Sequence, residues 1–158
     1  MLWSYAKFIK RIVHHKYWVL YYGIKIGGVP LWNLLTHDMS KFSREEFKPR
    51  FRHQILKVIP YESEEYQKCM DAHHERNAHH WQYWLWKKGV PHKNGEPMPM
   101  PEREVRHMLA DWQAAQKTYK GEKLSDWFRI EYPKMCLHPE TVGILEPLLK
   151  AIGIEIPK

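Results

Sequence analysis

The chain has 158 residues, 44% of them hydrophobic, which is the size of one domain that can bury a core without disulfides or metal staples. Its formal net charge of +7 favours an anionic partner, although basic composition alone does not separate nucleic acid from small phosphorylated molecules or an acidic protein. The two cysteines form no Cys-x-x-Cys pair, which argues against a redox motif or a disulfide scaffold and fits a reducing cytoplasm.

The first helix is predicted to start at a cap on Ser4, and its apolar side chains recur at helical spacing as far as Tyr22. His15 lies on that apolar stripe, where a lone histidine is more often a satisfied core residue than a ligand. Lys25 and Pro30 interrupt the apolar stretch 17–35 well short of a membrane span. We therefore expect neither a membrane partner nor a signal peptide.

A second helix is predicted to begin near Leu31 and to run to Phe42, and it carries the dipeptide His37-Asp38 with Lys41 one turn later. Adjacent side chains on one helix point about 100° apart, so both could reach one ion lodged between helices. Imidazole with carboxylate suits Zn, Mn, Fe or Co, and the second carboxylate oxygen could bridge to another ion. Taken alone, the dipeptide equally fits a solvated helix on which Asp38 and Lys41 form a surface pair.

Histidines form the next signal, because the chain has 11 of them and six lie in the adjacent pairs 14–15, 73–74 and 79–80. A long helix predicted from about Ser63 to Trp84 would align His73, Asn77 and His80 on one face. Three polar residues in register on an otherwise apolar face indicate a polar cavity or a metal, and the alternative is a hydrogen-bond network in the core.

The remaining elements are predicted from breakers and caps. Ser43 indicates a capped restart, and Pro49 and Pro60 bound an irregular stretch after it. Segment 89–101 has no helical period and is either a lid over a site or a surface excursion. No strand-forming alternation is present, so the predicted fold class is all-α, a compact single-domain helical bundle over residues 1–158, with later helices from about 102, over 125–130 and over 139–152.

The order of these features resembles the HD-domain metal-dependent phosphohydrolases, whose signature is His, then His-Asp, then Asp. This resemblance implies an HD-type helical domain that holds a metal with an open coordination position through His15, His37, Asp38 and Asp111. The run 73–81 also looks like the added histidines of HD proteins that hold two metals, although the Gly-Tyr-Pro element of cyclic-dinucleotide phosphodiesterases is absent here.

The sequence is also similar, over nearly its full length, to an uncharacterised family of small phage and bacterial proteins. The motifs that carry this similarity are His-Asp-x-Ser-Lys-Phe at 37–42, Asn-x-His-His-Trp at 77–81 and Met-Leu-Ala-Asp-Trp at 108–112. The similarity brings no established substrate. The cytoplasmic location expected from the cysteines would be the host cytoplasm if the protein is phage-encoded.

These features together predict a metal-dependent phosphohydrolase in which metal-bound water attacks phosphorus. The expected cofactor is one or two divalent ions, Mn, Fe, Co, Zn or Mg, and the expected partner is a small phosphorylated substrate, a nucleotide above all, with nucleic acid less favoured. Lys41 is expected to act on the phosphate, with Arg76 as a further anion clamp and Asn77 also binding substrate. His73, His74 and His79 are expected to supply further metal ligands, and His80 to donate a proton to the leaving oxygen.

The alternative is a non-catalytic module, in which the histidines hold a structural metal or a hydrogen-bond network and the basic surface binds nucleic acid, a nucleotide or another anion. Structural zinc sites are closed and thiolate-rich, whereas an excess of nitrogen and oxygen ligands favours catalysis. A third alternative is a phage protein that binds a host protein through Trp84, Trp86, Lys87 and Lys88, where a solvated helix end is the better interpretation. Four histidines are placed outside the site: His53, His92, His138 and His107. His107 could form a hydrogen bond with Asp111 or join the metal, but a surface pair with Asp111 is favoured.

Overall fold

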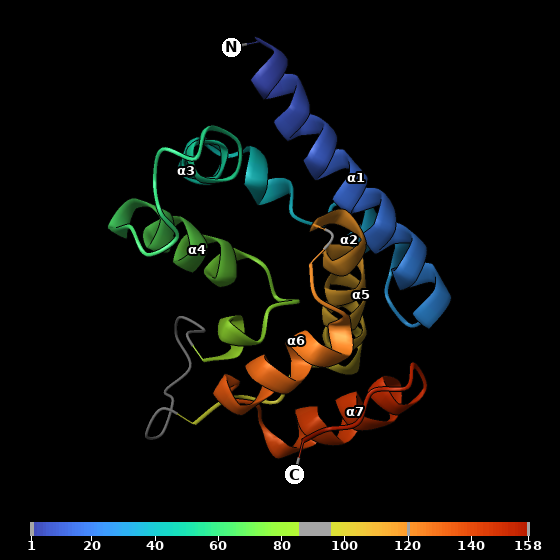
Figure 1. The fold of residues 1–158 in the computed structure, drawn as a ribbon. Helices are drawn as coiled ribbons and strands as arrows, with labels where there is room; N and C mark the ends of the chain where they lie inside the picture. Colours follow the sequence, from blue (N-terminus) through green and yellow to red (C-terminus); the bar gives the residue numbers. More distant parts are fainter. Residues whose placement is uncertain (1, 86–95, 120, 158) are drawn as a thin grey trace.

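The computed structural model describes residues 2–85, 96–119 and 121–157, and the regular elements among them are all helical (Figure 1). The predicted all-α class is therefore confirmed. The α-helices are α1 (Leu2–Ile26), α2 (Leu31–Leu35), α3 (Arg44–Phe51), α4 (Glu64–Arg76), α5 (Glu102–Tyr119), α6 (Leu124–Glu131) and α7 (Pro139–Lys150). Short 3-10 or π turns are η1 (Met39–Phe42), η2 (Arg52–Leu56), η3 (Trp81–Trp84) and η4 (Tyr132–Lys134). In the described part of the chain, no helix is both long and apolar enough to cross a membrane.

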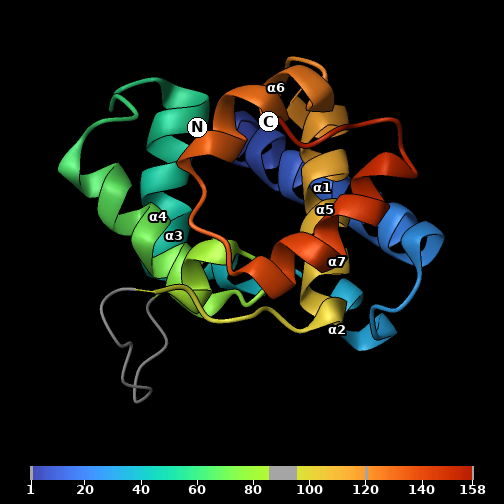
Figure 2. The ribbon, with the colours of Figure 1, turned by 90° about the horizontal axis from the view of Figure 1, so that it is seen from below.

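Helix α5 lies at the centre of the fold, because α1 packs along it and α6 and α7 also contact it (Figure 2). Helices α3 and α4 pack against each other on another side of the molecule (Figure 1). The apolar face predicted for α5 is confirmed as part of the main core, which contains Val105, Met108, Leu109 and Trp112 of α5, Phe128 of α6, and Leu145 and Leu149 of α7.

Two smaller apolar clusters lie along α1 on either side of His15. Phe8 and Ile12 pack with Phe51 before it, and Val19 packs with Leu34 and Ala114 after it. Each cluster joins α1 to a different neighbour, α3 in the first case and α2 with α5 in the second. The side chain of His15 is therefore sealed between apolar layers, and the polar residues that meet it are held in a largely dry interior.

Several predicted helix boundaries are wrong. Helix α1 begins at Leu2, so Ser4 lies inside it, because nothing before Ser4 breaks the helix. The second helix ends at Leu35, and Pro49 lies within α3 instead of ending it. The restart at Ser43 is confirmed, since its hydroxyl accepts a hydrogen bond from the backbone N–H of Glu46 at 3.4 Å.

Segment 89–101, predicted as either a lid or a surface excursion, lies outside the described residues over 89–95, as do Trp86, Lys87 and Lys88. Within its described part, Met100 is buried, and its backbone N–H donates to Thr141 Oγ1 at 2.9 Å. This end of the segment is therefore anchored on α7. Trp84, predicted as an exposed contact residue, is only 8% exposed and packs in the main core.

Candidate metal centre

The His37-Asp38 pair lies in a turn between α2 and η1, not on a continuous helix as predicted. Asp38 adopts the left-handed conformation, with φ 52° and ψ 29°, which the short polar side chain of aspartate tolerates. A helix would direct the two side chains about 100° apart. The turn instead directs both inward, so that His37 Nε2 lies 3.1 Å from Asp38 Oδ2.

Four buried side chains from three elements converge on this turn: His15 of α1, His37 and Asp38 of the turn, and Asp111 of α5. His15 Nε2 lies 2.9 Å from Asp111 Oδ1, 3.2 Å from His37 Nε2 and 3.9 Å from Asp38 Oδ2. Two ligand atoms that bind one Zn at about 2.0–2.1 Å in tetrahedral geometry are about 3.3 Å apart. The spacing of these four side chains therefore suits one ion.

A second group forms around the other oxygen of Asp38. His79 Nε2 and His73 Nε2 lie 3.3 and 3.5 Å from Asp38 Oδ1, and His80 Nε2 lies 2.9 Å from His73 Nε2. Asp38, His73 and His80 are close enough to share an ion. Since the Oδ2 atom of Asp38 faces the first group and the Oδ1 atom faces the second, this carboxylate lies where it could bridge two ions.

The second group arises because α4 ends at Arg76, so the predicted continuous helix to Trp84 is wrong. Asn77 Nδ2 donates to the backbone carbonyl of His73 at 2.7 Å, and the backbone of Asn77 turns to an extended conformation. Asn77 also donates to Ser40 Oγ at 2.9 Å, which ties the end of α4 to η1. The chain that follows then returns His79 and His80 towards the side chain of His73.

Two residues that the sequence analysis left outside the site, Glu46 and His107, orient the candidate ligands from behind. His73 donates from Nδ1 to Glu46 Oε2 at 2.8 Å, and Glu46 is fully buried. His37 Nδ1 and His107 Nε2 are joined by a hydrogen bond of 3.0 Å. His107 is only 3% exposed, so the prediction that it lies on the surface is wrong. Such partners fix the tautomer and the ring orientation of a metal-binding histidine.

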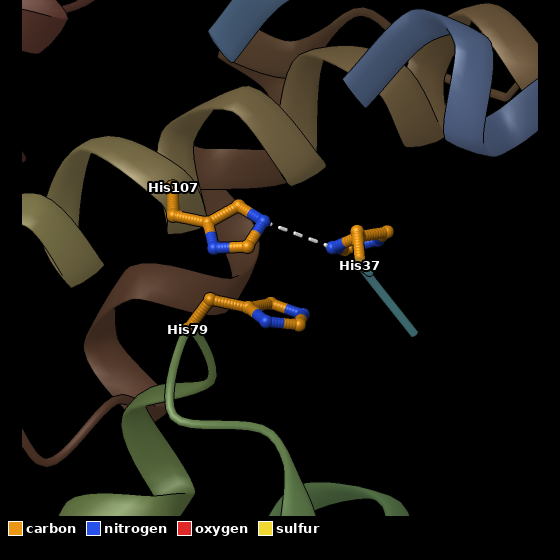
Figure 3. A group of neighbouring side chains, drawn as sticks. All are labelled: His37, His79 and His107. Carbon is orange, nitrogen blue, oxygen red and sulfur yellow. Dashed lines mark hydrogen bonds between the residues drawn. The ribbon is translucent and has the colours of Figure 1, made fainter. Parts of the chain in front are cut away.

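The imidazole rings of His37, His79 and His107 form a further close group (Figure 3). The ring centroid of His79 lies 4.5 Å from that of His37 and 4.5 Å from that of His107. If His37 binds an ion through Nε2, its proton stays on Nδ1 and is donated to His107. The Nδ1 lone pair is then absent, so His107 acts as a support for His37, and this trio does not form a separate ion site.

Lys41 is buried beside the same carboxylate, with its Nζ atom 2.5 Å from Asp38 Oδ2. Burial disfavours its charged form, but the Asp38 carboxylate outweighs that effect and raises the pKa of Lys41. Burial likewise disfavours ionisation of Asp38, and His37 and Lys41 outweigh it and hold the pKa of Asp38 well below its usual range. A carboxylate and an ammonium group therefore coexist, both charged, at the centre of the cluster.

Most of the surrounding histidines are held neutral. Burial lowers the pKa of His73 to about 4 and that of His107 to about 2, and it lowers the pKa of His15 and His80 as well. His37 is the exception, because Asp38 and Asp111 raise its pKa against the effect of burial. Neutral imidazoles keep a lone pair near pH 7 and can bind a cation without first losing a proton.

The other predicted site residues lie at the edge of the cluster or away from it. His74 is half-buried, with its ring centroid 5.1 Å from that of His80, and is in none of the ion-binding groups found among the described residues. Arg76 is exposed and pairs with Glu45 and, at 3.4 Å, with Ser43 Oγ. Asn77 makes the hydrogen bonds to His73 and Ser40 given above. The predicted roles of His74 in metal binding and of Arg76 and Asn77 in substrate binding stay predictions.

The donor set of the cluster fits a divalent cation. Among the described residues, Asp38 Oδ1 and His79 Nε2 are buried side-chain atoms without a hydrogen bond, and they lie 3.3 Å apart in the second group. A buried polar group left unsatisfied costs about 1–3 kcal/mol, so such atoms gathered in one place call for a partner. Imidazole and carboxylate together are ligands of Zn, Mn, Fe and Co.

Comparison with protein families gives one match, over residues 4–151, to a family of unknown function, DUF5662. The chain belongs to that family. Neither the search of curated proteins nor that of solved structures gives a match. The DUF5662 model covers the elements that carry the histidine and aspartate cluster, from α1 to α5.

Proposed function

We propose that this DUF5662 protein is a metal-dependent phosphohydrolase that acts on a nucleotide or another phosphoester. The observation that carries the proposal is the position of Asp38, whose two oxygens face two separate groups of histidines while Lys41 Nζ lies 2.5 Å away. One or two divalent ions and a fixed ammonium group would then flank the same point. That combination suits the negative charge that develops on a phosphoryl group during its transfer.

Each residue of the cluster has a role in this proposal. His15, His37, Asp38 and Asp111 would hold the first ion, and Asp38, His73 and His79 or His80 the second. When bound, the ions would supply a hydroxide nucleophile near neutral pH and polarise the phosphoryl oxygens. Lys41 would bind a phosphate oxygen. His80, which is half-buried beside a hollow, would have to gain a proton before it could donate one to the leaving oxygen, because burial lowers its pKa.

The order of the candidate ligands along the chain supports the same proposal. His15, the dyad at 37–38 and Asp111 follow the HD-domain signature, and in this structure the four side chains lie together. The ligand types point the same way, because thiolates are absent from the groups found among the described residues, and structural zinc sites are usually rich in them.

One observation favours a second candidate function, a non-catalytic anion-binding module. The Lys41 ammonium already balances the charge of Asp38, and Asp38 and Asp111 raise the pKa of His37 against the effect of burial, which favours its charged form. These contacts would allow the cluster to exist as a hydrogen-bonded network without an ion. The two functions differ in whether the purified protein retains metal.

The proposal is tested by elemental analysis of protein purified without a nickel column, together with phosphate release from nucleotides and diesters in the presence of Mn. Asp38→Asn removes the shared carboxylate charge but keeps the side-chain shape, so we expect both ions and the activity to be lost. Asp71→Asn is the matched control, because Asp71 is exposed on α4. It should retain the metal content and activity of the wild type.

Metal in the wild type and in Asp71→Asn, with none in folded Asp38→Asn, would support the metal centre. Phosphate release that follows the same pattern would support the hydrolase. Wild-type protein that is folded, metal-free and inactive with added Mn would overturn the hydrolase and favour the network of hydrogen bonds.

A further inference from the structure

The candidate metal centre opens to the surface through a hollow of about 270 Å³, here called the site hollow. Its wall includes the candidate ligands His80 and Asp111 and the half-buried His74. Most of the cluster is buried, so this hollow is where a substrate can approach Asp111 and His80 from outside. Trp112, Ala115 and Trp127 also line it.

The same three residues line a second hollow of about 290 Å³, here called the aromatic hollow, together with Gln116, Tyr119 and Leu124. The two hollows therefore adjoin. The wall of the aromatic hollow is mainly apolar, and the rings of Trp112 and Trp127 meet at 61° with their centroids 5.5 Å apart. Two faces of a corner are thus formed by indole rings, which suits a flat ring that stacks on one and touches the edge of the other.

The aromatic hollow also reaches the candidate metal centre at its other end. The ring of Tyr119 lies 5.9 Å from that of His15, centroid to centroid, and Tyr119 is near enough to Lys41 to influence its pKa. The aromatic hollow therefore borders the candidate metal centre in two places, through the site hollow that Asp111 lines and through Tyr119 beside His15.

Charge fixes the direction in which a molecule with a phosphate and a flat ring would lie. Glu122 borders the aromatic hollow, and its carboxylate would repel a phosphate there. Lys41 and the candidate ions attract a phosphate at the other end. Gln116 offers both an amide donor and a carbonyl acceptor to the edge of a ring, whereas the apolar wall offers nothing to a bare sugar.

We propose that the aromatic hollow is a base-binding subsite, formed by Trp112, Gln116, Tyr119 and Trp127, and that the substrate is a mononucleotide. The inference rests on the proposed hydrolase for the phosphate end of the molecule. The base end rests only on the shape and chemistry of the aromatic hollow. The two parts can therefore be tested separately.

The test compares AMP, GMP, CMP and UMP with ribose 5-phosphate, which lacks the ring, by titration calorimetry on Mn-loaded full-length protein. Phosphate release is followed in the same samples, and KM replaces Kd wherever a compound is hydrolysed. Stacking of a base on an aromatic side chain strengthens binding by about tenfold or more, so at least one nucleotide should bind that much more tightly than ribose 5-phosphate.

Two opposite changes are made in the subsite. Trp127→Ala removes one indole wall, and Ala115→Phe fills the space between the walls. Either change should remove the advantage of the nucleotide, because it should weaken nucleotide binding much more than binding of ribose 5-phosphate. Trp32→Ala is the control, because Trp32 is 72% exposed on α2, and it should keep the advantage. Circular dichroism and metal content confirm that each variant is folded.

Nucleotides that bind wild-type protein no more tightly than ribose 5-phosphate would overturn the subsite, whether or not phosphate is released. Equal weakening of nucleotide and ribose 5-phosphate in folded Trp127→Ala and Ala115→Phe would overturn it as well. Failure of the hydrolase appears differently, as absent metal and no phosphate release. A preference for nucleotides that depends on Trp127 would then still support the base-binding hollow.

Discussion

Glu46 is a fully buried carboxylate whose Oε2 atom accepts a hydrogen bond from His73 Nδ1 at 2.8 Å. The buried guanidinium of Arg50, with Nε 3.6 Å from the same oxygen, helps to keep Glu46 charged. A carboxylate behind a histidine holds the proton on the nitrogen that faces the carboxylate, here Nδ1. The other nitrogen, Nε2, is then directed towards the ligand cluster with its lone pair. Glu46 is therefore a positioning residue for the second ion, although it touches neither Asp38 nor substrate.

We expect Glu46→Gln to weaken binding of the second ion by about 10- to 100-fold, the usual effect of losing such a support, while the first ion stays bound. Titration of metal-free protein with Mn, followed by electron paramagnetic resonance, would resolve the two affinities. Glu45→Gln is the matched control, since Glu45 is exposed and pairs only with exposed Arg76 among the candidate site residues. Equal loss of both ions in Glu46→Gln would contradict the assignment.

The sequence allowed prediction of the residues that lie next to each other in the chain or follow a known order. His37 and Asp38 are adjacent, and the pairs at 73–74 and 79–80 are conspicuous by number. Glu46 and His107 could not be found in this way. Glu46 follows a helix cap, where glutamate is expected in water, and His107 stands one turn before Asp111, where a surface pair is the ordinary interpretation.

At the scale of elements, the fold class and the main helices could be predicted because apolar spacing is set locally. The two turns that build the site could not. Both depend on single conformations, the left-handed backbone of Asp38 and the extended backbone of Asn77, and helical spacing continues through both positions in the sequence. The prediction placed His37 with Asp38, and His73 with His80, on continuous helices. In the structure, these turns bring the same side chains together.

Close contact between α1 and α2 places the His37 turn, and Gly23 permits that contact. A Cβ atom on Gly23 would overlap the side chain of Leu34, which is buried against α1. We expect Gly23→Ala to lower stability by about 1–3 kcal/mol despite the better helix propensity of alanine, because overpacking of a core costs that much. Displacement of α2 should also weaken metal binding.

The matched control is Gly143→Ala in α7, where a Cβ would meet nothing within 4 Å. Here the helix propensity acts alone, so a gain of about 0.5–1 kcal/mol is expected. Denaturant unfolding measures the stability of both variants and of the double variant Gly23→Ala with Leu34→Ala, and titration with Mn measures their metal affinity. If the double variant shows no recovery of metal affinity relative to Gly23→Ala, contact with Leu34 is not what positions the turn.

At the scale of the whole molecule, a polar cluster is enclosed between three apolar clusters, and burial lowers the pKa of several of its histidines. This arrangement makes the stability of the folded protein depend on pH. The folded pKa of His73 and of His74 is about 4 and that of His107 about 2, whereas each titrates near 6.5 in an unfolded chain. Below pH 6.5 the unfolded chain therefore binds protons that the folded protein does not.

Linkage then fixes the sign, because the state that binds more protons gains as pH falls. The metal-free protein should be most stable above pH 6.5 and lose stability as pH falls towards 4, by up to about 1.4 kcal/mol per pH unit for each such histidine. His37 acts in the opposite direction, since its raised pKa favours the folded state at low pH, but it is one group against several. Asp38 and Asp111, with lowered pKa values, add to the loss in more strongly acidic solution.

The measurement is the urea midpoint of EDTA-treated protein at pH 7 and pH 5, for the wild type, His107→Gln and His14→Gln. His107→Gln removes one group that must stay neutral, so the difference between the two midpoints should shrink. His14 is exposed on α1, and its replacement should leave the difference unchanged. A wild-type midpoint that is equal or higher at pH 5 would mean that the buried histidines accept protons in the folded state. Lone pairs on neutral histidines would then not be what prepares the cluster for a cation.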